Sequence, residues 1–207
     1  MRKDSLVKKG FGLTPSARSR GPRLNHLIAL GVCPMNLYNS KSFNTTLIID
    51  KKLPAYSYLE REQVLEMPTE QAERQDIRPM EIGILNLMPS AVVERTEVQL
   101  LRLLANTPLQ IRPTFIYFDT HKSRSKQDHF DEFYKTIQQV KEAGLDGLII
   151  TGANLEDRAF EDVYYWKELV ALMDWAHGNA TSTIYSCWAA QAKLYQKYGI
   201  APHQYKE

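Results

Sequence analysis

The sequence predicts a doubly wound α/β fold with a mainly parallel sheet. Four short segments rich in apolar or β-branched residues are each followed by a segment whose apolar residues recur at helical spacing. Parallel strands need crossovers of this length, and right-handed crossovers place helices on both faces of a sheet. Ligands of such folds bind beyond the carboxyl ends of the strands, so catalytic residues are expected there.

The predicted strands are short and bounded by turn residues. They span residues 81–87, 111–118, 145–150 and 181–186. The last of them, Thr-Ser-Thr-Ile-Tyr-Ser, is β-branched and aromatic and follows Gly178 and Asn179, which mark a turn. The carboxyl ends of these strands should therefore meet at one edge of the sheet.

Three of the predicted helices are indicated by a stripe of apolar residues, and the fourth by its helix-forming residues. The helices span residues 92–104, 130–140, 160–176 and 188–195. In the second of them Phe130, Phe133, Tyr134, Ile137 and Val140 recur at helical spacing. The fourth is rich in helix formers and is followed by Gly199, a residue type that commonly ends helices.

Composition limits the classes of protein that the chain can represent. At 207 residues and 43% hydrophobic content it can bury a substantial core. Cys33 and Cys187 are its only cysteines, so no disulfide framework is implied and a reducing cytoplasm is expected. No apolar run reaches the length that spans a bilayer, and we expect no membrane partner.

Residues 1–52 form a basic extension ahead of the predicted domain, which spans residues 53–207. The first fifty residues hold eight Lys or Arg and two acids, with Gly, Pro and Ser punctuation and no sustained period. An organellar transit peptide or a nucleic-acid-binding arm would also be basic, but base-stacking aromatic residues are sparse. We interpret the extension as a disordered or non-native leader, and we expect no nucleic-acid partner.

Cys187 is the candidate nucleophile. It follows the strand 181–186 directly and precedes the helix that begins at Trp188. A thiol at a helix amino terminus feels the positive end of the helix dipole, which favours the reactive thiolate. The alternative is a buried cysteine that packs as a small apolar residue. The position at the catalytic edge of the sheet favours the nucleophile.

Gly152 and Trp188 are the candidate oxyanion-binding residues. Thr151, Gly152 and Ala153 end a neighbouring strand, and glycine lets a backbone N–H approach a ligand closely. Together with the Trp188 N–H, the Gly152 N–H can stabilise the negative charge that develops during acyl transfer. The alternative is that Gly152 only permits a turn.

Several motifs then carry a resemblance to a known family. They are Asn86-Leu87-Met88-Pro89, residues 99–110 (QLLRLLANTPLQ), Phe133-Tyr134-Lys135-Thr136, residues 146–153 (DGLIITGA), Tyr165-Trp166, Cys187-Trp188-Ala189 and Tyr198-Gly199-Ile200. From about residue 53 to residue 207 the chain resembles the homoserine O-succinyltransferase/O-acetyltransferase family. The resemblance implies a class I glutamine-amidotransferase-like (flavodoxin-like) fold.

The resemblance also implies a reaction. Members move an acyl group from acetyl-CoA or succinyl-CoA to the hydroxyl of L-homoserine, in methionine biosynthesis. The residue that matches Cys187 carries the acyl group as a thioester, which divides one difficult step into two easier ones. No metal and no cofactor are implied, because acyl-CoA is a substrate, and a homodimer is allowed.

Glu156 matches the position that is associated with acyl choice in the family. Members with Glu there tend to use acetyl-CoA, and members with Gly tend to use succinyl-CoA. A carboxylate repels the free carboxylate of a succinyl group and tolerates a methyl group, so acetyl-CoA is favoured here. The alternative is that Glu156 and Asp157 form an acidic cluster at a helix start.

The chain also departs from the family pattern. The catalytic His and Glu of the family are expected beyond residue 207, and none of the five histidines matches that base; His121 and His129 are expected on solvated surface. We interpret the chain as an incomplete domain, truncated at the carboxyl end and inactive alone. The alternative is a catalytically dead remnant, or a module that binds acyl-CoA or a partner. An amidotransferase is disfavoured because no glycine flanks the cysteine.

Overall fold

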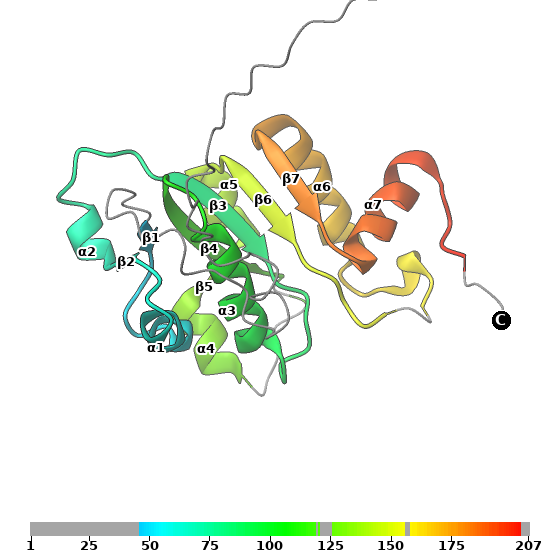
Figure 1. The fold of residues 1–207 in the computed structure, drawn as a ribbon. Coiled ribbons are helices and arrows are strands. Elements are labelled where there is room, and N and C mark those ends of the chain that lie inside the picture. The colour runs from blue at the N-terminus through cyan, green and yellow to red at the C-terminus, as the bar shows by residue number, and fades with distance from the viewer. Residues whose placement is uncertain (1–45, 119, 121–125, 156–157, 204–207) are drawn as a thin grey trace, which may run out of the picture. The chain divides into compact units, whose positions relative to one another are not determined.

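The fold is an α/β sandwich around one parallel sheet. The structure is a computed structural model, and it describes residues 46–118, 120, 126–155 and 158–203. The strands are β1 (Thr46–Ile48), β2 (Glu66–Met67), β3 (Met80–Leu85), β4 (Gln110–Tyr117), β5 (Tyr134–Thr136), β6 (Gly147–Ile150) and β7 (Ser182–Tyr185). Their order is β2-β1-β4-β3-β6-β7, with β5 also paired to β4, and every pairing is parallel (Figure 1). The predicted α/β class with a parallel sheet is confirmed.

Helices connect the strands and cover both faces of the sheet. They are α1 (Pro54–Arg61), α2 (Thr69–Ala72), α3 (Val93–Leu104), α4 (Gln127–Phe133), α5 (Ile137–Ala143), α6 (Trp166–Asn179) and α7 (Trp188–Tyr198), with a 3-10 turn at Phe160–Asp162. Successive strand residues enter different cores, as Ile84 and Leu85 do. One core joins the sheet to α1, α3 and α4, and the other joins it to α5, α6 and α7. This alternation is the pleat of a strand buried on both sides.

The predicted helix over residues 130–140 is wrong in one respect. Its apolar stripe is real, but the backbone becomes extended at Tyr134, and β5 separates α4 from α5. Thr136 then starts α5 with a capping box, in which its hydroxyl accepts from the Gln139 N–H and the Gln139 side chain accepts from the Thr136 N–H. Pairing of β5 with β4 and this cap together override the helical spacing.

The amino-terminal strands were not predicted. β1 lies inside the sheet between β2 and β4, although residues 46–52 fall in the predicted extension. The rest of that extension, residues 1–45, lies outside the described residues, so the leader stays a prediction. At the other end, α7 closes on Gly199 in a left-handed conformation (φ 67°), as its sequence indicated.

The strand order reverses between β3 and β6. After β3 the chain crosses to β4 on one side, and β6 then pairs with the other side of β3. In doubly wound sheets a ligand crevice forms at such a reversal of strand order. Asn86 and Thr151 directly follow the two strands. The reversal thus places both predicted strand-end motifs at the expected edge.

Candidate active site

Cys187 lies at a sharp strand-to-helix junction. β7 ends at Tyr185 and α7 begins at Trp188, and Cys187 is the residue before the helix. Its backbone has φ 51° and ψ −120°, a conformation that side chains with a Cβ rarely adopt. Such a conformation costs on the order of 1–3 kcal/mol and is characteristic of nucleophile turns. The thiol is exposed, which excludes the alternative of a buried, packing cysteine.

Gly152 lies directly against the cysteine. A Cβ placed on Gly152 would lie 3.0 Å from Cys187 Cβ and 3.5 Å from Sγ. The first distance is shorter than nearly all real contacts of this kind, so a larger residue would displace the thiol. Parallel pairing of β6 with β7 brings the two strand ends together, with Ile150 opposite Tyr185. The structure therefore brings together Gly152, Cys187 and Trp188, as the sequence predicted.

Two backbone donors near the thiol have no acceptor among the described residues. Neither the Gly152 N–H nor the Trp188 N–H forms a hydrogen bond to any residue that the structure describes. Trp188 is the first residue of α7, whose N–H a helix leaves unsatisfied. Its indole is buried among Phe160 and Tyr165, which fixes the start of the helix. Two free donors beside a nucleophile suit an anionic oxygen.

The Asn-Leu-Met-Pro segment is pinned to the neighbouring strand end. The Leu87 N–H donates to Thr151 Oγ1 at 2.8 Å, and the Asn86 carboxamide oxygen accepts from the Met88 N–H at 3.2 Å. Asn86 Nδ2 also donates to the Val93 carbonyl oxygen at 3.3 Å. Asn86 and Thr151 are both buried. These contacts explain why polar residues end two apolar strands.

A buried polar network, which the sequence did not predict, contacts the side chain of Asn86. Glu97 on α3 is 0% exposed, and its Oε1 accepts from the Tyr134 hydroxyl at 2.6 Å and contacts His129 Nε2 at 2.7 Å. Asn86 Nδ2 reaches the same hydroxyl at 3.2 Å. Burial, and then the Glu97 carboxylate, raise the pKa of Tyr134 above its usual range, so it stays a hydrogen-bond donor.

The expectation that His129 lies on solvated surface is therefore wrong. Its side chain is only 9% exposed, because Phe130, Phe133 and Tyr134 lie around the ring. The signal available in the sequence was a polar residue four positions before Phe133, in line with the apolar stripe that follows. His177 lies in the last turn of α6. Glu156, Asp157 and His121 lie outside the described residues, so the acyl-choice assignment stays a prediction.

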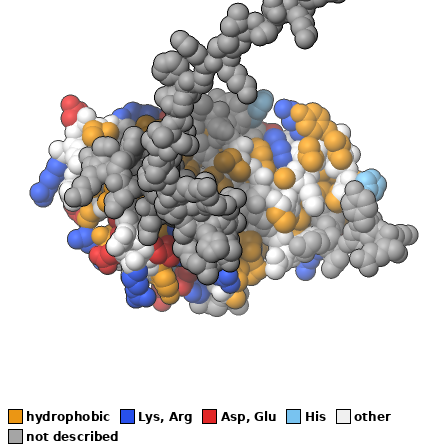
Figure 2. All heavy atoms as spheres, in the orientation of Figure 1, with side chains coloured by type: hydrophobic (Ala, Val, Ile, Leu, Met, Phe, Trp, Pro, Cys, Tyr) orange, Lys and Arg blue, Asp and Glu red, His pale blue; other side chains and the backbone are white. Residues whose placement is uncertain are grey.

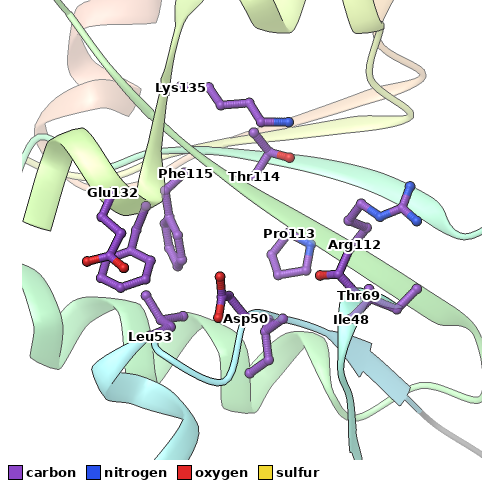
Figure 3. Close-up of a pocket in the computed structure, with 12 residues that line it drawn as sticks. Ile48, Asp50, Leu53, Thr69, Arg112, Pro113, Thr114, Phe115, Glu132 and Lys135 are labelled. Carbon is purple, nitrogen blue, oxygen red and sulfur yellow. The ribbon is translucent and has the colours of Figure 1, made fainter. Parts of the chain in front are cut away.

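A separate hollow of about 200 Å³ lies where β1 ends and β5 begins beside β4. Figure 3 shows Asp50 reaching into it, with Glu132 and Lys135 around it. Arg112, also in its wall, pairs with Glu81 at 2.7 Å. The lining holds both charge signs and contains no cysteine or histidine, so it does not compete with Cys187 as a nucleophilic site.

Other classes of site are not found in the described part of the chain. No group of three His, Cys, Asp or Glu residues is placed there to hold a metal ion. No helix in the same ranges is both long and apolar enough to cross a membrane.

The sequence of the chain is also similar to the sequences of known proteins. A family model described as homoserine O-succinyltransferase matches residues 46–207. The chain belongs to this family. It is 50% identical over 162 residues to a homoserine O-acetyltransferase of Bacillus cytotoxicus, covering 78% of this chain and 53% of that protein. It is 51% identical over 153 residues to one of Streptococcus thermophilus, covering 73% and 48%.

A third relative, the homoserine O-acetyltransferase of Bacillus cereus, is 48% identical over 162 residues, covering 78% of this chain and 53% of that protein. The chain thus spans about half the length of the curated relatives that it matches.

Proposed function

We propose that this chain supplies the nucleophile of a homoserine O-acetyltransferase. Cys187 accepts an acetyl group from acetyl-CoA and passes it to the hydroxyl of L-homoserine. The observation that carries the proposal is the exposed Cys187, held at φ 51° against Gly152 and near two N–H groups that no described residue accepts from. The names of the relatives support acetyl as the acyl group and homoserine as the acceptor.

The reaction divides into two balanced steps. The Cys187 thiolate attacks the carbonyl carbon of the acetyl thioester, and the carbonyl oxygen becomes an oxyanion. When this intermediate collapses, the bond to the CoA sulfur breaks, and CoA leaves with the proton that Cys187 lost. The homoserine hydroxyl then attacks the Cys187 thioester, gives its proton to a base, and leaves as the O-acetyl ester while Cys187 is restored.

The described residues supply distinct parts of this chemistry. Strain at Cys187 projects the thiol from the sheet edge, because buried residues hold the start of α7 and the partly buried Tyr185 anchors the end of β7. The Gly152 and Trp188 N–H groups stabilise the oxyanion in both steps, an effect worth about 3 kcal/mol per donor in acyl-transfer enzymes. In the family resemblance the base is a His supported by a Glu, and no histidine here matches it.

Three finer assignments are also part of the proposal. The sheet order and the nucleophile turn support a class I glutamine-amidotransferase-like arrangement. The reaction serves methionine biosynthesis in the cytoplasm. Glu156 selects acetyl over succinyl, because its carboxylate repels the second carboxylate of a succinyl group.

Intact-mass spectrometry of the 207-residue chain tests the first step. After incubation with acetyl-CoA we expect one acetyl adduct, formed slowly, because the two backbone donors act without the base. The adduct should disappear in Cys187→Ala and persist in the matched control Cys33→Ala. Equal labelling of Cys33 and Cys187, or no labelling of Cys187, would contradict the proposal.

A further inference from the structure

Thr151 forms a hydrogen-bonded bridge at the point where the strand order reverses. It is buried at the end of β6, and its hydroxyl oxygen accepts from the Leu87 N–H at 2.8 Å. The same hydroxyl donates its single proton to the carbonyl oxygen of Gly152 at 3.1 Å. One hydroxyl can fill both roles at once, because it carries one donor and two acceptor lone pairs. The bridge therefore joins the loop after β3 to the residue that touches Cys187.

The second bond fixes the direction of the next peptide group. Its carbonyl belongs to Gly152 and its N–H to Ala153, and the described chain has no cis peptide bond. In a trans peptide the N–H points opposite to the carbonyl oxygen. While the Thr151 hydroxyl holds the Gly152 carbonyl, the Ala153 N–H must point away from it. Without that bond, glycine at 152 would let this peptide rotate.

The Ala153 N–H is an unexplained buried donor. Ala153 is only 4% exposed, and its N–H has no acceptor among the residues that the structure describes. Buried backbone donors are almost always paired, so an unpaired one next to a reactive group calls for a ligand. Its neighbour in the chain, Gly152, lies against the thiol. No described residue supplies an acceptor for this N–H, and an oxygen of a molecule bound at Cys187 would supply one.

We propose that Thr151 is a positioning residue for acyl transfer at Cys187. Its hydroxyl orients the peptide group between Gly152 and Ala153 so that the Ala153 N–H points to the oxyanion. The inference rests on the proposed function and adds a donor to the Gly152 and Trp188 N–H groups. As the Cys187 thiolate adds to the thioester carbonyl, the displaced electron pair settles on oxygen, which the Ala153 N–H then hydrogen-bonds. On collapse that pair re-forms the carbonyl, the bond to the CoA sulfur breaks, and CoA leaves with the proton that Cys187 lost.

A purely structural role for Thr151 makes a different prediction. If the bridge only fastens β3 to β6, its loss should disturb the thiol toward every reagent alike. Alkylation by iodoacetamide distinguishes the two roles, because thiolate displaces iodide from a saturated carbon and no oxyanion forms. A positioning role lowers acylation and spares alkylation.

The experiment compares Thr151→Val, which keeps the shape and removes the hydroxyl, with Thr151→Ser, which keeps the hydroxyl. In the 207-residue chain, the rates of acetyl adduct formation from acetyl-CoA and of iodoacetamide labelling at Cys187 are followed by intact mass. We expect Thr151→Val to acylate at least tenfold more slowly, consistent with the loss of an oxyanion donor. Its alkylation should stay within about twofold of wild type, and Thr151→Ser should acylate within about threefold.

Each result bears on the proposal separately from the proposed function. Equal acylation of Thr151→Val and wild type overturns the role of Thr151, and so does an equal loss of acylation and alkylation. Failure of Thr151→Ser to restore the rate also overturns it. If Thr151→Val does not fold by circular dichroism, Thr151→Ala against Thr151→Ser provides the same comparison. A wild-type chain that alkylates but never acylates overturns the proposed function itself.

Discussion

At the scale of single residues, the site depends on the strained backbone of Cys187 and on the small size of Gly152. Cys187 holds a backbone conformation that is unfavourable by itself, and the buried start of α7 together with the partly buried Tyr185 at the end of β7 imposes it. Gly152 leaves the space that the thiol occupies. The sequence indicated both residues, since a cysteine at a strand end and a glycine on the next strand were visible. It did not indicate the strain, which requires the fold.

Gly152→Ala tests this close approach. The added Cβ would lie 3.0 Å from Cys187 Cβ, so the nucleophile turn has to shift. We expect acetyl adduct formation to fall about tenfold or more, because a displaced nucleophile loses its alignment. The unfolding free energy should fall by about 1–3 kcal/mol, a usual cost of overpacking. Gly178→Ala is the matched control, since a Cβ there meets open space. An unchanged acylation rate would show that the approach is unimportant.

Glu156→Gly tests acyl choice. The measurement is kcat/KM for acetyl-CoA and succinyl-CoA in a protein where residues 1–207 are followed by the carboxyl-terminal region of the Bacillus cytotoxicus relative. We expect wild type to prefer acetyl-CoA, and the substitution to shift the ratio toward succinyl-CoA by roughly a hundredfold. Asp157→Gly, the adjacent acid, is the control and should leave the ratio alone. A wild-type preference for succinyl-CoA would refute the acetyl assignment.

Glu66 makes stability depend on pH. Burial raises its pKa to about 7, and the like charge of Glu60 adds to the shift. The folded state therefore holds the proton more tightly than the unfolded state, and stability falls as pH rises from about 4.5 to 7. Glu66→Gln should be more stable than wild type above pH 7, because it removes the buried charge. The gain should be only about 1 kcal/mol, because solvent screens this half-buried group. Urea unfolding at pH 4 and pH 8 measures the difference in unfolding free energy between the variant and wild type. A difference that is equal at both pH values would contradict the prediction.

At the scale of elements, the apolar periodicity of the sequence and the tertiary contacts both determine the secondary structure, and they do not always favour the same one. The helices α3 and α7 were predicted well, because α3 has an apolar face over several turns, and α7 is rich in helix formers and ends at Gly199. The segment 130–140 was not, because an extended Tyr134 reaches Glu97 and β5 pairs with β4. β1 and β2 have three and two residues, too few for any period to show. The network of Glu97, His129 and Tyr134 depends on contacts between three elements and is invisible in one sequence.

His129→Leu and Glu97→Leu test that network as a coupled pair. Removing His129 takes one hydrogen-bond partner from the buried Glu97 carboxylate. The other oxygen of that carboxylate, Oε2, already has no partner among the described residues. We expect this to cost about 3 kcal/mol of unfolding free energy. The double variant should lose at least 1 kcal/mol less unfolding free energy than the two single variants lose together, because no unpaired buried carboxylate remains. His177→Leu, on an exposed last turn, is the control. Additive single effects in urea unfolding would contradict the coupling.

At the scale of the whole molecule, the described sheet has an unpaired side at β7. Only β6 pairs with β7 among the described strands, and Ile184 on it is 59% exposed. Figure 2 shows hydrophobic side chains, in orange, on the side where β7 and α6 lie, whereas charged side chains gather around α1 and α2. A strand edge with apolar neighbours is a template for association.

We therefore expect the 207-residue chain to associate in a concentration-dependent way when it is expressed alone. Ile184→Lys should lower the association, since a charge on an edge strand blocks further pairing. Leu103→Lys is the matched control, because Leu103 is 74% exposed but lies on α3. Sedimentation velocity measures the mass distribution. A monodisperse, cooperatively melting monomer would contradict the expectation, and so would equal effects of the two substitutions.

The central claim is that acetyl groups reach homoserine through Cys187. In the protein extended by the carboxyl-terminal region of the Bacillus cytotoxicus relative, acetyl-CoA labelled in its acetyl group can be followed in a single turnover. We expect label to appear first on Cys187 and then, only when L-homoserine is added, to leave it as O-acetylhomoserine. Formation of that product by Cys187→Ala at the wild-type rate would contradict transfer through Cys187, and so would a labelled Cys187 that never transfers its acetyl group.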